Sequence, residues 1–298
     1  MLDDEQLAVV LLNSTLCGEG VQPLKAGELW ALIGELGTVD LLLGLDAQEM
    51  VAELDFEPAH AARLAALMGR ATAMAFELER LEQSGISTIT LYDDDYPQRW
   101  MQRLGPKAPA VVHVAGAPSL LGGAGSDACL GVVGSRDIDD AAAATAAAAG
   151  AWAAEHAMAL VSGGARGVDQ TAMDAAAAAG GSVVGIMAEP LVRAVARPET
   201  RRAILAGTTA LCTPYAPDAP FTAGRAHGRN RLIYALGDPT LVVSCTEGAG
   251  GTWTGATEAI AGGWNTVAVW RGPGDGPGNA ALADAGATAV HALDELDG

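Results

Sequence analysis

The stretch LGVVGSRDIDDAAAATAAAAGAWAAEHAMALVSGGARGVDQ, residues 130–170, decides the fold of this chain. It begins with a short apolar run that stops at Gly134-Ser135-Arg136, and an alanine-rich helical segment follows at about 139–155. A second apolar run, 158–161, ends in a glycine-rich turn at 162–167. The order strand, helix, strand predicts two parallel strands joined by a right-handed crossover, and therefore an α/β fold.

Both strands end in small residues that are followed by an arginine, Arg136 or Arg166, at the same carboxyl edge of the expected sheet. Ligands of open α/β sheets bind at that edge. Glycines let the backbone approach an anion, helix N-termini supply N–H donors, and arginines supply positive charge. The pattern therefore favours a phosphate-binding edge. The alternative is that the glycines only form tight turns and the arginines pair with surface carboxylates.

The rest of the chain after residue 85 alternates between strands and helices. Strands are expected at 87–91, 111–114, 182–187, 209–212, 240–245, 266–270 and near 289–290, and helices at 169–179, 199–206, 229–236 and 252–261. Loops are expected at 116–127 and 213–228, which are rich in glycine, proline and alanine. This alternation predicts a doubly wound, mostly parallel sheet over residues 85–298.

Residues 1–84 are expected to form a small all-helical domain of the SAM or helix-hairpin-helix type. Apolar residues recur there at three- and four-residue intervals, which predicts helices at 3–12, 24–36, 39–45, 47–54 and 58–83. Acidic residues dominate this segment, so we expect protein contact or structural packing here and no direct contact with phosphate.

Composition places the chain among cytoplasmic globular proteins. Its four cysteines, Cys17, Cys129, Cys212 and Cys245, are far apart and are expected to be reduced thiols. The sequence shows no metal-ligand cluster, no signal peptide and no apolar stretch long enough to span a membrane. No pairing of a nucleophile with a base is evident either. We therefore expect no catalytic residue, no metal and no cofactor.

The formal net charge of −19 is distributed unevenly. Residues 1–129 carry 19 acidic and 7 basic side chains, and residues 233–298 carry 8 acidic and 1 basic. Residues 130–232 carry 9 of each, and all nine basic residues are arginines. An acidic protein with a local arginine cluster favours a focused anion site over a broad nucleic-acid groove.

Five motifs occur in an order that resembles the DprA/Smf family of DNA-processing proteins. They are GISTITLYDDDYPQRW (85–100), GVVGSR (131–136), SGGARGVDQTA (162–172), GRNRLI (228–233) and GNAALADAGA (278–287). The resemblance implies an extended Rossmann-like domain that binds single-stranded DNA and forms a homodimer. It also implies a role in loading a RecA-type recombinase during natural transformation or recombination, without enzymatic activity.

The same resemblance implies a phosphate pocket on which four arginines converge. Arg-Asn-Arg at 229–231 is expected to open a helix, so that two guanidiniums and free backbone N–H groups meet one anion. Asp169 is expected to orient Arg166 or to cap the following helix. The implied pocket residues are Gly134, Ser135, Arg136, Ser162, Gly163, Arg166, Gly167, Asp169, Arg229, Asn230 and Arg231.

One turn departs from the family pattern. The segment EGAGGTWTGATEA (247–259) is similar to the motif PGGxGTxxE of the LOG-type nucleotide phosphoribohydrolases, which belong to the same superfamily. Gly250, Gly251 and Thr252 could thus form a nucleotide-binding turn, and Glu258 is either a catalytic carboxylate or an ordinary helix glutamate. The alternative functions are a nucleotide-binding or nucleotide-cleaving protein and a paralogue that acts only through protein contacts.

Overall fold

The computed structural model describes residues 2–17, 20–122 and 128–297. Their strands form one nine-stranded sheet in the order β1-β2-β6-β5-β4-β3-β7-β8-β9. The strands from β6 to β9 in this order are parallel, whereas β1 and β2 join antiparallel at one edge. The strands are β1 (Ser87–Thr90), β2 (Val111–Ala115), β3 (Cys129–Val133), β4 (Ala159–Ser162), β5 (Val183–Ile186), β6 (Thr209–Thr213), β7 (Thr240–Val242), β8 (Val267–Trp270) and β9 (Thr288–Val290).

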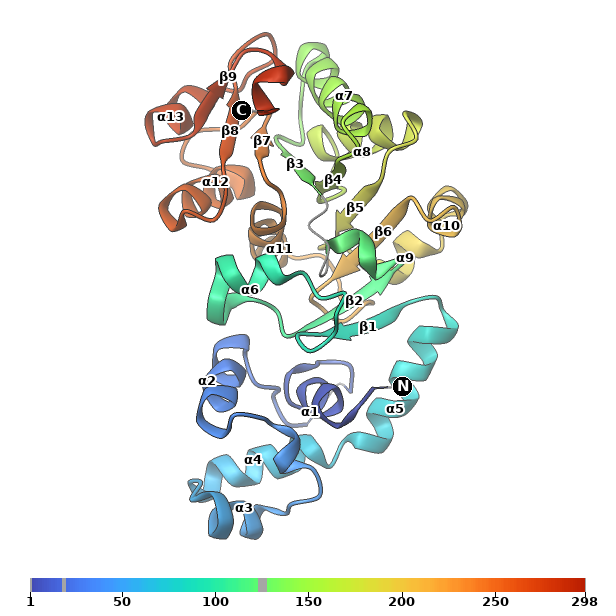
Figure 1. The fold of residues 1–298 in the computed structure, drawn as a ribbon, viewed down its shortest axis with the longest axis vertical. Helices are drawn as coiled ribbons and strands as arrows, with labels where there is room; N and C mark the ends of the chain where they lie inside the picture. Colours follow the sequence, from blue (N-terminus) through green and yellow to red (C-terminus); the bar gives the residue numbers. More distant parts are fainter. Residues whose placement is uncertain (1, 18–19, 123–127, 298) are drawn as a thin grey trace.

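Helices cover both faces of the sheet, so the doubly wound, extended Rossmann-like fold predicted from the sequence is confirmed (Figure 1). α7 and α8 pack on one face, and α11 packs on the other. The described α-helices are α1 (Asp4–Asn13), α2 (Ala26–Leu36), α3 (Ala47–Leu54), α4 (Pro58–Met68), α5 (Ala71–Gln83), α6 (Gln98–Leu104), α7 (Asp140–Glu155), α8 (Val168–Ala178), α9 (Leu191–Val195), α10 (Pro198–Leu205), α11 (Ala223–Leu236), α12 (Gly250–Gly262) and α13 (Asn279–Asp284).

Alternate side chains of the central strands supply the two cores. In β3, Leu130 and Val132 are buried in the cluster under α7 and α8, whereas Cys129 and Val133 belong to the cluster under α11. Small residues let α7 and α8 pack closely, because a Cβ at Gly150 would lie 2.2 Å from the carbonyl oxygen of Ala172. The alanine-rich segment is therefore a helix face that brings α7 and α8 close together.

The strand order places a crevice beside β3. From β3 the chain moves outward through β4, β5 and β6, and then returns through α11 to β7 on the other side of β3. Such a reversal of strand order separates the loops at the carboxyl ends of the two central strands, and ligands of open α/β sheets bind there. The crevice between the ends of β3 and β7 is thus the expected site.

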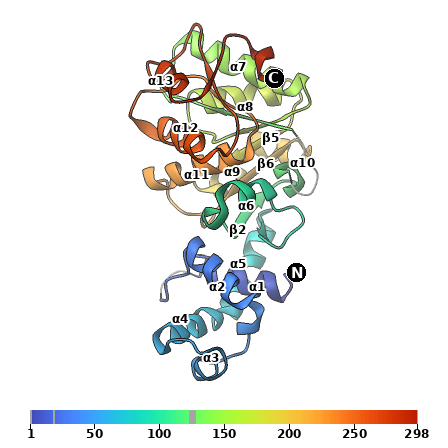
Figure 2. The same cartoon turned by 60° about the vertical axis from the view of Figure 1, so that its left-hand side comes forward.

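The N-terminal helices lie at the end of the molecule nearest to β1 and β2 (Figures 1 and 2). Their buried side chains join the same apolar cluster as the sheet, and the indole N–H of Trp30 donates to the carbonyl of Ala108 at 3.2 Å. A domain boundary near residue 84 stays a prediction.

The prediction of a single helix at 58–83 is wrong. The structure has α4 and α5 there, separated at Gly69-Arg70. Glycine has a low helix propensity, and the break lets apolar residues of both halves, such as Leu64 and Leu81, reach buried positions. The helix expected at 39–45 is a single 3₁₀ turn, Asp40–Leu42. In the loop expected at 116–127, Pro118–Leu121 forms a 3₁₀ turn, and residues 123–127 lie outside the described part of the chain.

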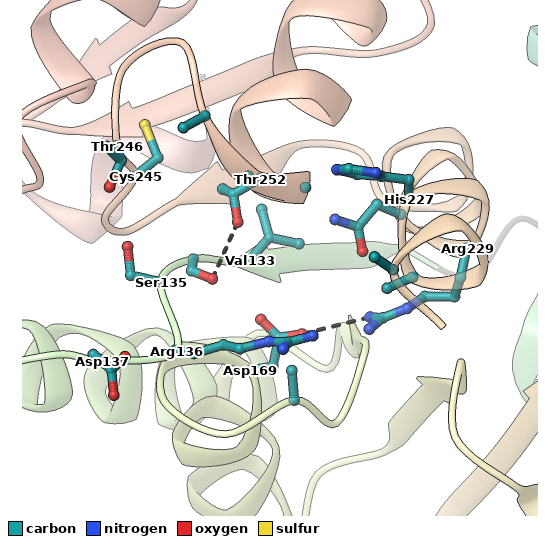
Figure 3. Close-up of a pocket in the computed structure, with 18 of the residues that line it drawn as sticks. Val133, Ser135, Arg136, Asp137, Asp169, His227, Arg229, Cys245, Thr246 and Thr252 are labelled. Carbon is teal, nitrogen blue, oxygen red and sulfur yellow. Dashed lines mark hydrogen bonds and ion pairs between the residues drawn. The ribbon is translucent and has the colours of Figure 1, made fainter. Parts of the chain in front are cut away.

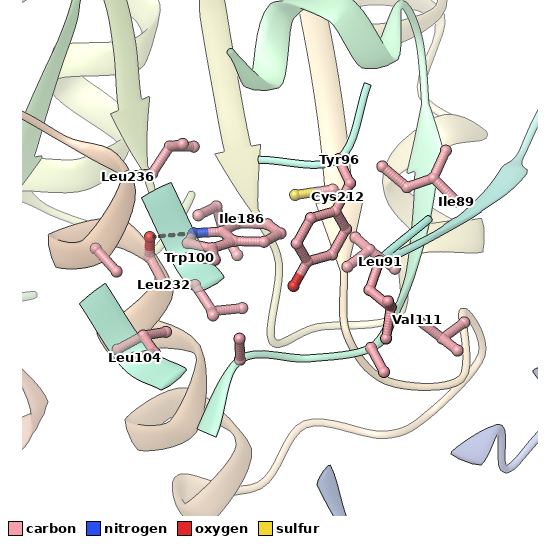
Figure 4. Close-up of a cluster of buried hydrophobic side chains, with 14 of the residues drawn as sticks. Ile89, Leu91, Tyr96, Trp100, Leu104, Val111, Ile186, Cys212, Leu232 and Leu236 are labelled. Atoms are coloured by element: carbon pink, nitrogen blue, oxygen red, sulfur yellow. Dashed lines mark hydrogen bonds between the residues drawn. The ribbon is translucent and has the colours of Figure 1, made fainter. Parts of the chain in front are cut away.

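The helix α6, which the sequence analysis did not identify, holds the C-terminal end of α11 (Figure 4). The buried indole of Trp100 donates to the carbonyl oxygen of Leu232 at 2.9 Å. The guanidiniums of Arg99 and Arg103 donate to the last carbonyls of α11 and of the residue after it, Leu236, Ala235 and Gly237, at 2.9–3.1 Å. Cations there also complement the helix dipole. The DYPQRW segment therefore positions the helix that carries Arg229.

Candidate phosphate-binding site

A pocket of about 480 Å³ occupies the crevice between the ends of β3 and β7 (Figure 3). Its walls come from the turn after β3, the start of α8, one face of α11, and the segment that joins β7 to α12. The lining residues are Val133, Gly134, Ser135, Arg136, Asp137, Ala165, Asp169, Phe221, Ala223, Ala226, His227, Arg229, Asn230, Cys245, Thr246, Ala249, Gly250, Gly251 and Thr252.

Arg229 is the buried cation of this pocket, and its residue is only 3% exposed. Its Nη1 lies 3.5 Å from a carboxylate oxygen of Asp169. Within the described part of the chain, neither Nε nor Nη1 of Arg229 makes a hydrogen bond. Buried polar groups normally have hydrogen-bond partners, so the guanidinium of this pocket-lining residue keeps hydrogen-bonding capacity that the described residues do not use.

Gly163 makes room for this guanidinium. A Cβ built at Gly163 would lie 1.0 Å from Nη1 and 2.1 Å from Cζ of Arg229. Any larger residue at this position would therefore have to move the guanidinium or the backbone. Gly163, in the turn after β4, therefore leaves the space into which the guanidinium of Arg229 packs.

Burial dominates the ionisation of the Asp169–Arg229 pair. It raises the pKa of the Asp169 carboxyl, against the opposing effects of Arg229 and of the backbone N–H groups of Ala165 and Gly134. Burial likewise lowers the pKa of Arg229, and the nearby charge of Arg136 acts in the same direction. The two guanidiniums enter the pocket from opposite sides in Figure 3. An anion bound between Arg136 and Arg229 would relieve their repulsion.

The N-terminus of α12 forms another wall of the pocket. Gly250, Gly251 and Thr252 line it, and the N-cap residue of this 13-residue helix, Ala249, makes no side-chain hydrogen bond to the first N–H groups. The hydroxyl of Thr252 donates to the carbonyl oxygen of Gly134 at 3.1 Å, which ties α12 to the turn after β3. Uncapped N–H groups and the positive end of the helix dipole favour an anion at this place.

Several predicted site residues connect the segments that border the pocket, and of these Ser135 also lines it. The Ser162 hydroxyl is buried and donates to the Val132 carbonyl at 2.6 Å. The backbone N–H of Ser135 donates to the carbonyl of Ser244 at 2.9 Å. Gly167 has a φ of +88°, and a Cβ there would lie 2.4 Å from the Ser135 oxygen. These residues set the distance between the turns.

The expectation that Arg-Asn-Arg opens a helix is wrong. α11 begins six residues earlier, at Ala223, and Thr222 is its N-cap, accepting the N–H of Arg225. The backbone N–H groups at 229–231 consequently lie inside the helix. Side chains two positions apart on a helix do not face each other, so Arg229 and Arg231 point in different directions.

Arg231 lies outside the pocket lining and binds Glu258. Its Nε and Nη2 lie 2.5 and 2.9 Å from the two carboxylate oxygens. This bidentate pair also uses the glutamate that the nucleotide-cleaving alternative would need as a catalytic carboxylate. Asp169 neither orients Arg166 nor caps α8, whose N-cap is Gly167; it pairs with Arg229 instead. Arg166 is exposed and lies 2.7 Å from Asp137.

Arg166 borders an adjoining hollow of about 260 Å³ together with Arg136 and Arg229. The structure therefore brings three of the four predicted arginines to neighbouring hollows and directs the fourth elsewhere. Phe221 and Cys245-Thr246 also line the pocket, although the sequence pattern carries no signal for them. Finding them needs the strand order and the start of α11, which depend on tertiary packing.

The described residues contain no group of three or more His, Cys, Asp or Glu that could hold a metal ion. Among them there is also no helix long and apolar enough to cross a membrane.

Comparisons with known proteins agree with this architecture. A family model described as DNA recombination-mediator protein A matches residues 87–296. DNA processing protein A from Streptococcus pneumoniae has a similar fold, with a TM-score of 0.65 and 20% identity over 92% of this chain and 98% of that chain. DNA processing protein A from Helicobacter pylori, whose structure describes a single-stranded DNA binding mode, gives a TM-score of 0.57 and 18% identity over 72% and 96%. No curated protein matches the sequence.

Proposed function

Because this chain belongs to the DNA recombination-mediator protein A family, we propose that the pocket between the ends of β3 and β7 binds phosphates of single-stranded DNA. One observation carries the proposal: Arg229, whose buried guanidinium has two nitrogens without a hydrogen bond to the described residues, lines the same pocket as Arg136. The uncapped N-terminus of α12 adds further donors to the same pocket. Three independent elements thus supply positive potential to one hollow.

The shape and charge of the protein favour a single strand over a duplex. Duplex binding uses a broad basic surface, whereas this chain has a formal net charge of −19 and confines its arginine-rich segment to residues 130–232. A hollow of about 480 Å³ admits a phosphate with its sugar, which a flexible single strand can present one nucleotide at a time. The acidic surroundings repel the strand, so we expect affinities in the micromolar range.

The finer roles proposed rest on the family. They are the loading of a RecA-type recombinase onto single-stranded DNA in natural transformation or recombination, and action as a homodimer in the cytoplasm. We assign no catalytic step to the pocket, because the carboxylate of Glu258 is held by Arg231 outside it.

A mononucleotide site is the second candidate function. The glycine-rich N-terminus of α12, with Gly250 and Gly251 at the pocket wall, is an arrangement that also suits the phosphate of a free nucleotide. This candidate predicts tight binding of one small molecule and dependence on base identity, with little change when the strand is lengthened.

A competition experiment separates the two functions. A fluorescent dT oligomer is bound to the full chain and displaced by unlabelled dT oligomer, by duplex DNA of equal length, or by nucleoside monophosphates. We expect displacement by the single strand at the lowest concentration, because it offers several phosphates to adjoining hollows. Displacement by one monophosphate at lower concentrations than the oligomer would contradict the proposal and support the nucleotide site.

A further inference from the structure

We propose that Phe221 is a stacking platform for the base next to the phosphate in the pocket. This inference rests on the proposed function and adds a contact to a base, by which the protein would hold the strand in addition to its phosphates. Phe221 lies just before Thr222, the N-cap of α11, in the chain that leads from β6 to that helix.

The exposure of Phe221 separates it from core phenylalanines. Four large hydrophobic side chains are exposed among the described residues: Leu41, Phe76, Leu205 and Phe221. Phe221 is 42% exposed and is the one of these four that lines the pocket. An exposed aromatic ring beside a phosphate site is the arrangement by which proteins bind single strands without reading their sequence.

The ring also stands where three hollows meet. It lines the pocket of about 480 Å³, the adjoining hollow of about 260 Å³, and a larger hollow of about 1110 Å³ between α8, α9 and α10. Phe221 is shared by all three linings, so a strand that occupies the first pocket and one of the others would lie beside the ring. The larger hollow has Arg193 and Arg197 in its lining, and neither has a described salt bridge.

Arg136 links the platform to the phosphate site. Its Cζ lies 5.2 Å from the centroid of the Phe221 ring, over one face, within the range of a cation–π interaction. The same guanidinium lines the pocket. A phosphate bound by Arg136 and a base stacked on Phe221 would thus belong to the same or to adjacent nucleotides.

The start of α11 holds the backbone on both sides of Phe221. The Thr222 hydroxyl accepts the N–H of Arg225 at 3.1 Å, and the guanidinium of Arg225 reaches back to the carbonyl oxygen of Pro220. Both contacts flank Phe221. A platform held in this way loses little conformational entropy when a base stacks on it.

The test compares Phe221→Ala with Phe76→Ala, a matched control because Phe76 is 68% exposed on α5 and lines none of these hollows. Binding of a dT oligomer and of inorganic polyphosphate of similar charge is measured for each variant. We expect Phe221→Ala to weaken dT binding about tenfold and to leave polyphosphate binding unchanged, because stacking needs a base. Phe221→Trp should retain dT binding, and Phe76→Ala should change neither affinity.

Equal losses of dT and polyphosphate binding in Phe221→Ala would overturn the inference, because the ring would then serve only to hold Arg136. Unchanged dT binding in this variant would also overturn it, while the proposed function would stand. A wild-type chain that binds polyphosphate but no dT oligomer would contradict the proposed function as well. Thermal unfolding of each variant confirms that the exposed substitution leaves the fold intact.

Discussion

Replacing Gly163 by alanine is expected to weaken binding of a dT oligomer by about thirtyfold. The added Cβ would lie 1.0 Å from Nη1 of Arg229, so the buried guanidinium has to leave its present position. Its displacement removes the buried donors from the pocket wall, and a hydrogen bond to a charged group contributes about 1.5–3 kcal/mol. Fluorescence anisotropy with the labelled oligomer measures the loss.

Two comparisons make this prediction specific. Gly34→Ala on α2 is the matched control, because a Cβ there meets no atom within 4 Å and its φ is ordinary. It should leave binding unchanged and stabilise the helix slightly. In an Arg229→Ala background the clash at Gly163 disappears, so Gly163→Ala should then cause little further loss. Additive losses in the double variant would show that Gly163 acts on binding by another route.

Replacing Arg229 by methionine should lower the free energy of unfolding by about 3 kcal/mol at pH 7. Removing one partner of a buried ion pair leaves the other charge uncompensated, which costs about 3–5 kcal/mol. The backbone N–H groups of Ala165 and Gly134 still stabilise the Asp169 carboxylate, so we expect the lower end of the range. Denaturant unfolding measures the difference. Arg225→Met on the same helix, with no described salt bridge, is the control and should cost far less.

The loss of unfolding free energy caused by Arg229→Met, here called the deficit, should depend on pH. Burial already raises the pKa of Asp169, and loss of Arg229 removes an interaction that lowers it. A carboxyl whose folded pKa lies above its unfolded value loses stability as the pH rises above the unfolded value. The deficit should therefore shrink as the pH falls to and below about 4, the unfolded pKa of an aspartate, because Asp169 then becomes protonated in both states. Asp169→Asn should restore part of the stability at pH 7. A deficit that is constant with pH would contradict the pairing.

Most of the sheet can be predicted from the sequence because its strands are short apolar runs that alternate with helices. Parallel strands force the carboxyl ends, and with them Arg136 and Arg166, to one edge. The helix α6, between β1 and β2, is harder to predict because it has only seven residues. Its role also depends on a hydrogen bond from Trp100 to the carbonyl of Leu232, which lies far along the chain.

The site can be predicted only in part, because three of its determinants are not evident from local sequence patterns. The start of α11 at Ala223, within a segment rich in glycine and alanine, places the backbone N–H groups of 229–231 inside the helix instead of at its N-terminus. The pairing of Asp169 with Arg229 joins residues sixty positions apart, and no local pattern signals it. The strand order brings the ends of β3 and β7 together, which places Cys245 and Thr246 at the pocket.

The salt dependence of dT binding tests most directly whether the pocket binds the phosphates of single-stranded DNA. Each phosphate contact contributes about 0.7 to the slope of log affinity against log salt for a single strand, so Arg136, Arg166 and Arg229 together predict a slope of about 2 in magnitude. Arg136→Ala should lower that slope by about 0.7, whereas Arg80→Ala, which removes the same charge from exposed α5, should leave it unchanged. A flat salt dependence, or an equal change in both variants, would contradict phosphate binding at this pocket.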